Sequence, residues 1–171
     1  MKVQDIGSSE YNPYFQGYIS KVGEGTLMES LEDGMRLTVD FFGNIPESKQ
    51  TFQYAEGKWT PKEILLHLID SERMFCFRAL SFARSENTNL PGFDENEFAA
   101  NSNANSRSIE NLLDEYMSVR NASIRLFGSF DEETLKRIGR ANNADLSVRA
   151  AGFLICGHEI HHRNIIAERY L

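Results

Sequence analysis

Apolar residues recur at helical spacing in four segments of this sequence, and no segment alternates apolar and polar residues over a convincing strand length. The second segment opens with Thr60-Pro-Lys-Glu63, a capping-box pattern with proline at the first helical position. Long helices without strands predict an all-α fold, a four-helix bundle. The predicted helices cover about 26–45, 60–82, 108–127 and 147–165.

The connections between these segments differ in length. Residues 85–107, rich in Asn, Ser, Pro and Gly, separate the second helix from the third by 23 residues. A connection this long can cross the whole bundle, so we expect a long crossover, with the second and third helices parallel and the second and fourth antiparallel. Residues 131–138 predict one further short helix with an acidic start.

The length of 171 residues is typical of one domain, 1–171. Within it, residues 1–24 form an N-terminal arm that contains Tyr11, Tyr14, Phe15 and Tyr18 without a clear period. We expect this arm to be extended and to pack either on the bundle or on a partner subunit. An exposed aromatic group of this size is typical of an interface, which favours a homodimer.

Charge and composition exclude several classes of function. The net charge of -7 and the pI near 5.1 argue against binding to nucleic acid or to an anionic membrane, because both need clustered lysine and arginine. No apolar stretch reaches the roughly 18 residues that a membrane span requires. The N-terminus has no apolar signal core, and Cys76 and Cys156 lie in apolar surroundings as expected of free thiols, so we expect a cytoplasmic protein.

Three of the four histidines fall within five residues near the C-terminus, in Gly157-His-Glu-Ile-His-His162. In a helix, His158 and His162 stand one turn apart on the same face, so both imidazoles can reach one metal ion. His67 lies in another apolar helical segment. Two ligands from one helix and one from another predict an open three-histidine metal site, because such a site keeps a position for water or substrate.

The segment from His158 to His162 also satisfies H-E-x-x-H, the zincin metalloprotease signature. The extended signature requires glycine and histidine downstream, where this chain has Ile165 and Glu168. A protease is therefore disfavoured, and His67 is the remaining histidine for a third ligand. His161 is expected to face solvent or to support the ligands, and Ser71, one turn after His67, is a candidate hydrogen-bond partner.

Glu159 has two interpretations. It is adjacent to His158, where its carboxylate can approach a water on the metal and act as a general base. It can equally be a surface glutamate that pairs with Arg163 at i+4. The sequence leaves both open.

Four motifs, spread over nearly the whole chain, carry a resemblance to a known family. They are Trp59-Thr-Pro-Lys-Glu-Ile-Leu-Leu-His-Leu-Ile-Asp-Ser-Glu72, Pro91-Gly-Phe-Asp-Glu-Asn-Glu97, Ser147-Val-Arg-Ala150 and Gly157-His-Glu-Ile-His-His162. With these motifs the chain resembles the DinB/YfiT-like family of metalloenzymes, the DinB superfamily. The resemblance implies a four-helix bundle with a long crossover and a divalent metal bound by one histidine of the second helix and two of the fourth, matching His67, His158 and His162.

The resemblance also implies a class of chemistry. The family includes S-transferases and isomerases that use a low-molecular-weight thiol (bacillithiol, mycothiol or glutathione), members named as metal-dependent hydrolases, and many homodimers. We therefore expect a metal-dependent enzyme that acts on a small molecule, with thiol transfer slightly preferred over hydrolysis on the resemblance alone.

An all-imidazole site with open positions suits one zinc or nickel ion per chain. Residues of the N-terminal arm, Trp59 and residues 93–98 are candidates for the mouth of a substrate pocket. The competing hypothesis is a non-catalytic, metal-stabilised binding or stress-response module. A fourth protein ligand would close its site, and the candidates are Asp70, Asp94 and Glu159.

Overall fold

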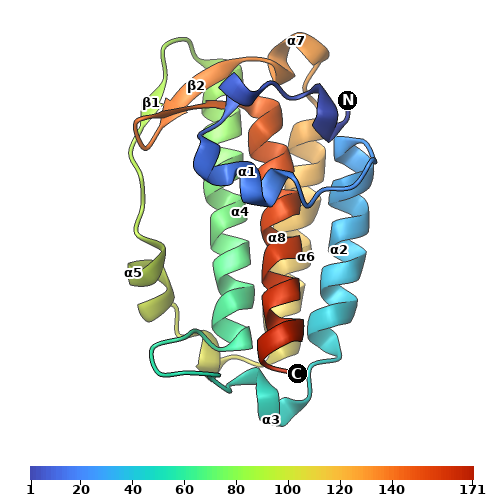
Figure 1. Cartoon of the computed structure of the whole chain (residues 1–171), viewed down its shortest axis with the longest axis vertical. Helices are drawn as coiled ribbons and strands as arrows, with labels where there is room; N and C mark the ends of the chain where they lie inside the picture. Colours follow the sequence, from blue (N-terminus) through green and yellow to red (C-terminus); the bar gives the residue numbers. More distant parts are fainter.

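The structure is a computed structural model that describes residues 1–171. Four long helices form a bundle, as the sequence predicts (Figure 1). Each begins directly after a hydroxyl side chain that accepts a hydrogen bond from a backbone N–H of the first turn, and Thr26 and Thr60 each form a complete capping box. The long helices are α2 (Leu27–Gly43), α4 (Pro61–Arg84), α6 (Ile109–Gly128) and α8 (Val148–Arg169).

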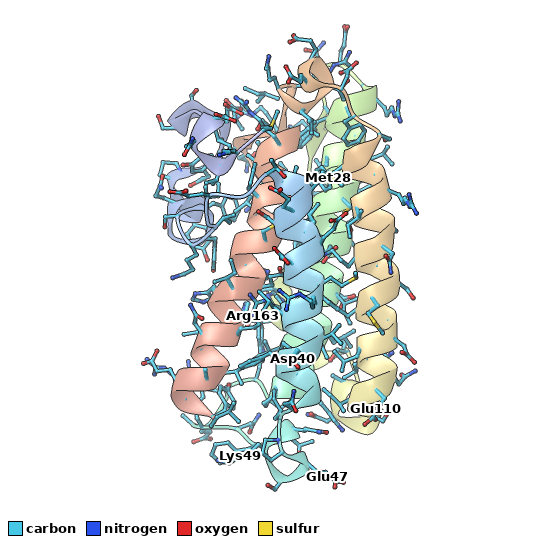
Figure 2. All side chains as sticks on the ribbon, turned by 90° about the vertical axis from the view of Figure 1, so that its right-hand side faces the viewer. Met28, Asp40, Glu47, Lys49, Glu110 and Arg163 are labelled. Carbon is cyan, nitrogen blue, oxygen red and sulfur yellow. The ribbon has the colours of Figure 1, made fainter.

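The order of the helices around the bundle follows from the crossover. Helix α4 packs against α8 and α6, and α2 packs against the same two neighbours. In Figure 1, α4 and α6 run parallel, while α8 runs antiparallel to α4. Figure 2 shows Met28 and Asp40 along the descending α2, and Glu110 at the lower end of α6. Residues 85–107 therefore return the chain along the bundle, and the predicted long crossover is confirmed.

Shorter helices and turns lie at the ends and along one side of the bundle. The crossover carries α5 and a 3-10 turn, and it flanks α4 in Figure 1. The N-terminal arm consists of three 3-10 turns and the short helix α1, so it is not extended as predicted. The short elements are η1 (Val3–Asp5), η2 (Ser8–Glu10), η3 (Pro13–Phe15), α1 (Gln16–Ile19), α3 (Glu47–Gln50), α5 (Glu95–Ala100), η4 (Ala104–Ser106) and α7 (Glu132–Leu135).

A small three-stranded sheet lies at one end of the bundle, which corrects the expectation of a fold without strands. Strand β2 (Ile138–Ala141) pairs in parallel with β1 (Asn89–Leu90) and antiparallel with β3 (Ala144–Ser147). Asn142 and Asn143 turn the β2–β3 hairpin with φ values of 51° and 61°, which asparagine tolerates better than most residues. The helix predicted over 131–138 is shorter, because α7 ends at Leu135 and the chain then enters β2.

The apolar core is divided into two parts by a polar layer. One cluster of 20 buried residues fills the end of the bundle near the sheet, and a second cluster of 14 fills the opposite end. Between the two clusters, the apolar stripe of each long helix is interrupted by at least one buried polar side chain. These residues are Thr38, His67, Ser71, Glu72, Arg120, Ser123 and Glu159.

The arm packs on its own bundle. Tyr11, Ile19 and Val22 are buried in the larger apolar cluster, and the Glu10 carboxylate accepts a hydrogen bond from Arg149 Nε at 2.7 Å. These aromatic and apolar groups are therefore covered within the chain. Cys76 and Cys156 are both free, as expected. No helix is long and apolar enough to cross a membrane.

The homodimer stays a prediction. Large apolar side chains that remain exposed include Phe77 and Leu80 on α4 and Ile138 on β2. We expect light scattering at micromolar concentrations to give about twice the chain mass of 19.5 kDa. A mass near that of one chain across the concentration range would contradict the prediction.

Candidate metal centre

The polar layer brings three histidines from two helices together. His67 comes from α4, and His158 and His162 come from successive turns of the antiparallel α8. One ligand nitrogen of each lies within 4.8 Å of the other two. The Nε2 atom of His158 lies 3.1 Å from Nε2 of His67 and 3.0 Å from Nε2 of His162. The residues that the spacing singled out thus form one group.

Hydrogen bonding alone does not account for these distances. A neutral imidazole nitrogen either donates its single N–H or accepts at its single in-plane lone pair. Nε2 of His158 therefore cannot form two well-directed hydrogen bonds with two other Nε2 atoms. At a usual metal–nitrogen distance of about 2.0–2.1 Å, two imidazoles on one ion are separated by roughly 2.8–3.4 Å. The two short distances fit nitrogens that share a cation.

Burial keeps the three imidazoles neutral. It lowers the pKa of His67 to about 4 and that of His162 to about 3. The pKa of His158 is also far below its ordinary value, first because of burial and second because of the neighbouring histidines. A metal ligand must offer an unprotonated lone pair. All three groups meet that requirement at neutral pH.

Neighbouring side chains hold the imidazole rings in place. The hydroxyl of Ser71 lies 3.4 Å from Nδ1 of His67, and the Trp59 ring packs against the same imidazole at a centroid distance of 4.7 Å. The ring of Tyr18, from the arm, meets His158 edge-on at 5.4 Å. His161 is half-buried, contacts Tyr18 at 5.1 Å and does not belong to the three-nitrogen group.

Glu159 is not brought to the histidines, and this corrects the expectation that its carboxylate approaches them. Its Oε2 accepts hydrogen bonds from Tyr116 at 2.7 Å and Arg120 at 2.8 Å, both on α6, and from Thr38 of α2 at 3.3 Å. The surface interpretation is corrected as well, because Glu159 is 1% exposed. Its pairing with Arg163 does exist, at 3.9 Å. In Figure 2, Arg163 lies at the seam between α8 and α2.

The carboxylate of Glu159 belongs to a buried network centred on Arg120. The guanidinium of Arg120 donates two bonds to Glu72 at 2.8 and 2.9 Å, two to Glu159 at 2.8 and 3.4 Å, and one to the carbonyl of Leu31 at 3.0 Å. Burial alone would lower the pKa of Arg120, but the charges of Glu159 and Glu72 hold it well above its ordinary value. Because Glu159 follows His158 and Glu72 follows Ser71, this network fixes how α8 and α4 face each other.

The other candidates for a fourth ligand have separate partners. Asp70 accepts a hydrogen bond from Arg73 at 3.2 Å near the surface. Asp94 caps α5, where its carboxylate accepts hydrogen bonds from the backbone of Asn96 and Glu97. The group that could hold an ion therefore consists of three histidines and includes no carboxylate.

A cavity of about 350 Å³ opens beside the histidines, within the range of small-molecule sites. His67 and His158 form part of its wall. The arm, α4, the crossover and the β2–β3 hairpin supply the rest, including Tyr14, Tyr18, Phe75, Arg78, Phe93 and Asp145. Trp59 lines a second cavity, of about 300 Å³, together with His161 and His162. All three predicted mouth segments, the arm, Trp59 and the region of Phe93, thus lie at cavities that border the histidines.

Comparison with known proteins places this arrangement in a family. A sequence profile described as the DinB superfamily matches residues 30–166, which contain all four long helices except their outermost ends. The chain belongs to the DinB superfamily. A search of curated proteins found no match.

Among solved structures, the chain is similar to YfiT from Bacillus subtilis. The TM-score is 0.74 at 18% sequence identity, over 83% of this chain and 82% of YfiT. YfiT is described as a probable metal-dependent hydrolase with an unusual four-helix bundle topology. At this identity the likeness shows a shared fold, a four-helix bundle.

In this DinB chain the arm crosses α8 next to the histidines, where Gly157 lets two backbones approach. A Cβ atom at Gly157 would lie 2.2 Å from the carbonyl oxygen of Tyr18. We expect Gly157→Ala to displace α1 and to lower the free energy of unfolding by about 1–3 kcal/mol, as overpacking does. Chemical denaturation measures the loss, and limited proteolysis should cut the loosened arm faster.

The control is Gly17→Ala. A Cβ atom at Gly17, in α1 itself, would have no neighbour within 4 Å. This variant should unfold at the same or a slightly higher denaturant concentration than the parent protein, because alanine favours the helix, and it should resist proteolysis at least equally. Equal behaviour of the Gly157 and Gly17 variants would show that the close approach of the arm does not matter.

Proposed function

We propose that this protein is a metal-dependent enzyme that acts on a small molecule at His67, His158 and His162, and that its reaction is thiol transfer. The observation that carries the proposal is the convergence of three neutral Nε2 atoms beside a cavity, without a carboxylate in the group. One zinc or nickel ion per chain suits three imidazole ligands, and three protein ligands leave coordination positions for a substrate.

A divalent ion held there would supply Lewis acidity and favour the ionised form of a thiol or of water. The chain's own residues supply the rest. The three imidazoles stay unprotonated because they are buried, and Ser71 and Trp59 restrict the ring of His67. Tyr18 and Phe75 shield the wall of the cavity next to His158 from water.

In the proposed reaction the thiol sulfur forms a bond to an electrophilic carbon. The leaving group departs with its bonding electrons, and the thiol proton passes to solvent. The contacts of Glu159 favour this chemistry over hydrolysis, because its carboxylate is fully engaged by α2 and α6 and is not placed to activate water. Thiol transfer needs no such base when the nucleophile is already ionised.

Metal-dependent hydrolysis is the second candidate, since YfiT is described as a probable metal-dependent hydrolase and shares this fold. The test compares the two reactions in protein loaded with zinc or nickel. Bacillithiol, mycothiol and glutathione are each supplied with an electrophile such as monobromobimane, and ester and amide substrates are supplied without thiol.

Thiol transfer predicts thiol consumption that depends on the metal and disappears in His67→Ala. Hydrolysis without thiol, lost in the same variant, would support the second candidate. A metal with four protein ligands and no activity in either assay would contradict both and favour the non-catalytic module.

A further inference from the structure

The wall of the cavity beside the histidines contains one buried cation that has neither a hydrogen-bond partner nor an ion-pair partner. Arg78 of α4 lines the cavity and is 6% exposed, and it is the only lysine or arginine in the wall. Its Nε is the one buried side-chain nitrogen or oxygen of the chain that lacks a hydrogen-bond partner. Its guanidinium forms no salt bridge. A buried charge without a partner is costly, so its presence requires an explanation.

The other well-buried arginines of the chain are paired. Arg120 uses its N–H groups on Glu72, Glu159 and the carbonyl of Leu31. Arg149 forms two hydrogen bonds with the carboxylate of Glu10. The fold thus satisfies its structural arginines from within, and Arg78 differs from both.

Two aromatic rings hold the guanidinium of Arg78. Its Cζ lies 5.7 Å from the ring centroid of Phe75 and 5.7 Å from that of Phe93. Such contacts hold the guanidinium plane in position and leave its N–H groups available for a planar acceptor. Glu95 and Asp145 also line the cavity, but neither comes within salt-bridge distance of Arg78. Asp145 lies instead 3.7 Å from Arg140.

The separation between Arg78 and the histidines along α4 limits the length of a molecule that can contact both. His67, Ser71, Phe75 and Arg78 lie on one face of α4 and all line the cavity. His67 and Arg78 are eleven positions apart, which corresponds to about 16 Å between their Cα atoms along the helix axis. The Phe75 ring lies between the two groups, 6.5 Å from the ring of His158 and 5.7 Å from Cζ of Arg78, so the guanidinium lies within about 12 Å of the His158 imidazole.

We propose that Arg78 binds a carboxylate of the substrate, which lies along this face of α4 with its reacting atom at the histidines and its carboxylate at the guanidinium, at most about 12 Å away. This inference rests on the proposed function in placing the reacting atom. A guanidinium fork binds a carboxylate through two parallel hydrogen bonds, which gives orientation as well as affinity. The substrate class is therefore an elongated small molecule with an acidic end.

The test uses two matched pairs of probes and calorimetric titration. In metal-loaded protein, 8-mercaptooctanoic acid is compared with 8-mercapto-1-octanol. The thiol group of each probe is expected to bind the metal, while its carboxylate or hydroxyl group reaches Arg78. After metal removal, octanoate is compared with 1-octanol, which tests Arg78 alone. In each pair the acid should bind about 10- to 100-fold more tightly than the alcohol, the gain expected from hydrogen bonds to a charged group.

Arg78→Met should abolish this preference in both pairs, and Arg78→Lys should retain part of it, because the charge remains while the fork is lost. Arg84→Met, an exposed cation on the same helix, is the control and should leave the preference intact. Arg78→Met should also melt at the same temperature as the parent protein or higher, since it removes an unpaired buried charge.

No preference for the acids in the parent protein, or an equal preference in Arg78→Met, would overturn the proposal. If Arg78→Met does not fold, an undiminished preference in Arg78→Lys would overturn it. If the metal-free pair shows the preference and the thiol probes bind no better with metal than without, Arg78 keeps its role and thiol chemistry fails.

Discussion

Replacing His158 by alanine is expected to reduce the metal content of the purified protein from about one ion per chain to nearly none. His158 is the central member of the group, because its Nε2 lies 3.0–3.1 Å from both other Nε2 atoms. The remaining pair, His67 and His162, comes from different helices and would have to hold the ion alone. Elemental analysis after dialysis measures the effect, and any metal-dependent activity should fall with it.

The matched control is His161→Ala. His161 lies on the same helix within the same cluster of sequence, yet it does not belong to the three-nitrogen group. Its replacement should leave metal content near one ion per chain. Full retention of metal by the His158 variant, or an equal loss in the His161 variant, would contradict the assignment of ligands.

Arg120→Met is expected to lower the free energy of unfolding by about 3–5 kcal/mol. The guanidinium is 1% exposed and holds two buried carboxylates, Glu72 and Glu159, which would be left without their counter-charge. Urea or guanidinium denaturation of the metal-free protein measures the loss. Because the network sets the orientation of α4 and α8, the variant should also bind metal more weakly.

An exposed ion pair provides the comparison for that experiment. Arg36 pairs with Asp33 at 3.3 Å, and both side chains are more than two-thirds exposed, at 69% and 68%. Arg36→Met should change the free energy of unfolding by less than about 1 kcal/mol, as is usual for surface pairs. Similar losses in the two variants would show that the Arg120 network is not a determinant of stability.

The four helices and the three histidines could be predicted because their signals are local. Thr26, Thr60, Ser108 and Ser147 each cap a helix through contacts within one turn, so the sequence alone places the helix starts. The pairing of His158 with His162 follows from helical geometry in the same way. Predicting that His67 lies near His158 and His162 required only that their two helices be antiparallel.

The role of Glu159 could not be predicted, because it depends on packing between distant segments. Helix α8 is buried on nearly all sides from Val148 to Gly157, so its sequence does not indicate which neighbour each face meets. A signal did exist on α6. Arg120 interrupts the apolar stripe that runs from Leu113 through Tyr116 to Phe127, and a charge at such a position indicates a buried partner.

The β2–β3 hairpin escaped prediction for a different reason. Its strands have four residues each, too few for an alternating pattern to stand out. The adjacent Asn142 and Asn143 were the available clue, since consecutive asparagines favour a hairpin turn. Because the hairpin was not predicted, the wall of the cavity that it forms, with Asp145 and Leu146, was not predicted either.

The most direct test of the metal centre is anomalous diffraction from crystals of the protein loaded with zinc or nickel, recorded on both sides of the metal's absorption edge. We expect one peak per chain, about 2.0–2.1 Å from Nε2 of His67, His158 and His162, with no further protein ligand. A peak at another place, a fourth ligand from the protein, or no peak between the three histidines would contradict the proposed centre.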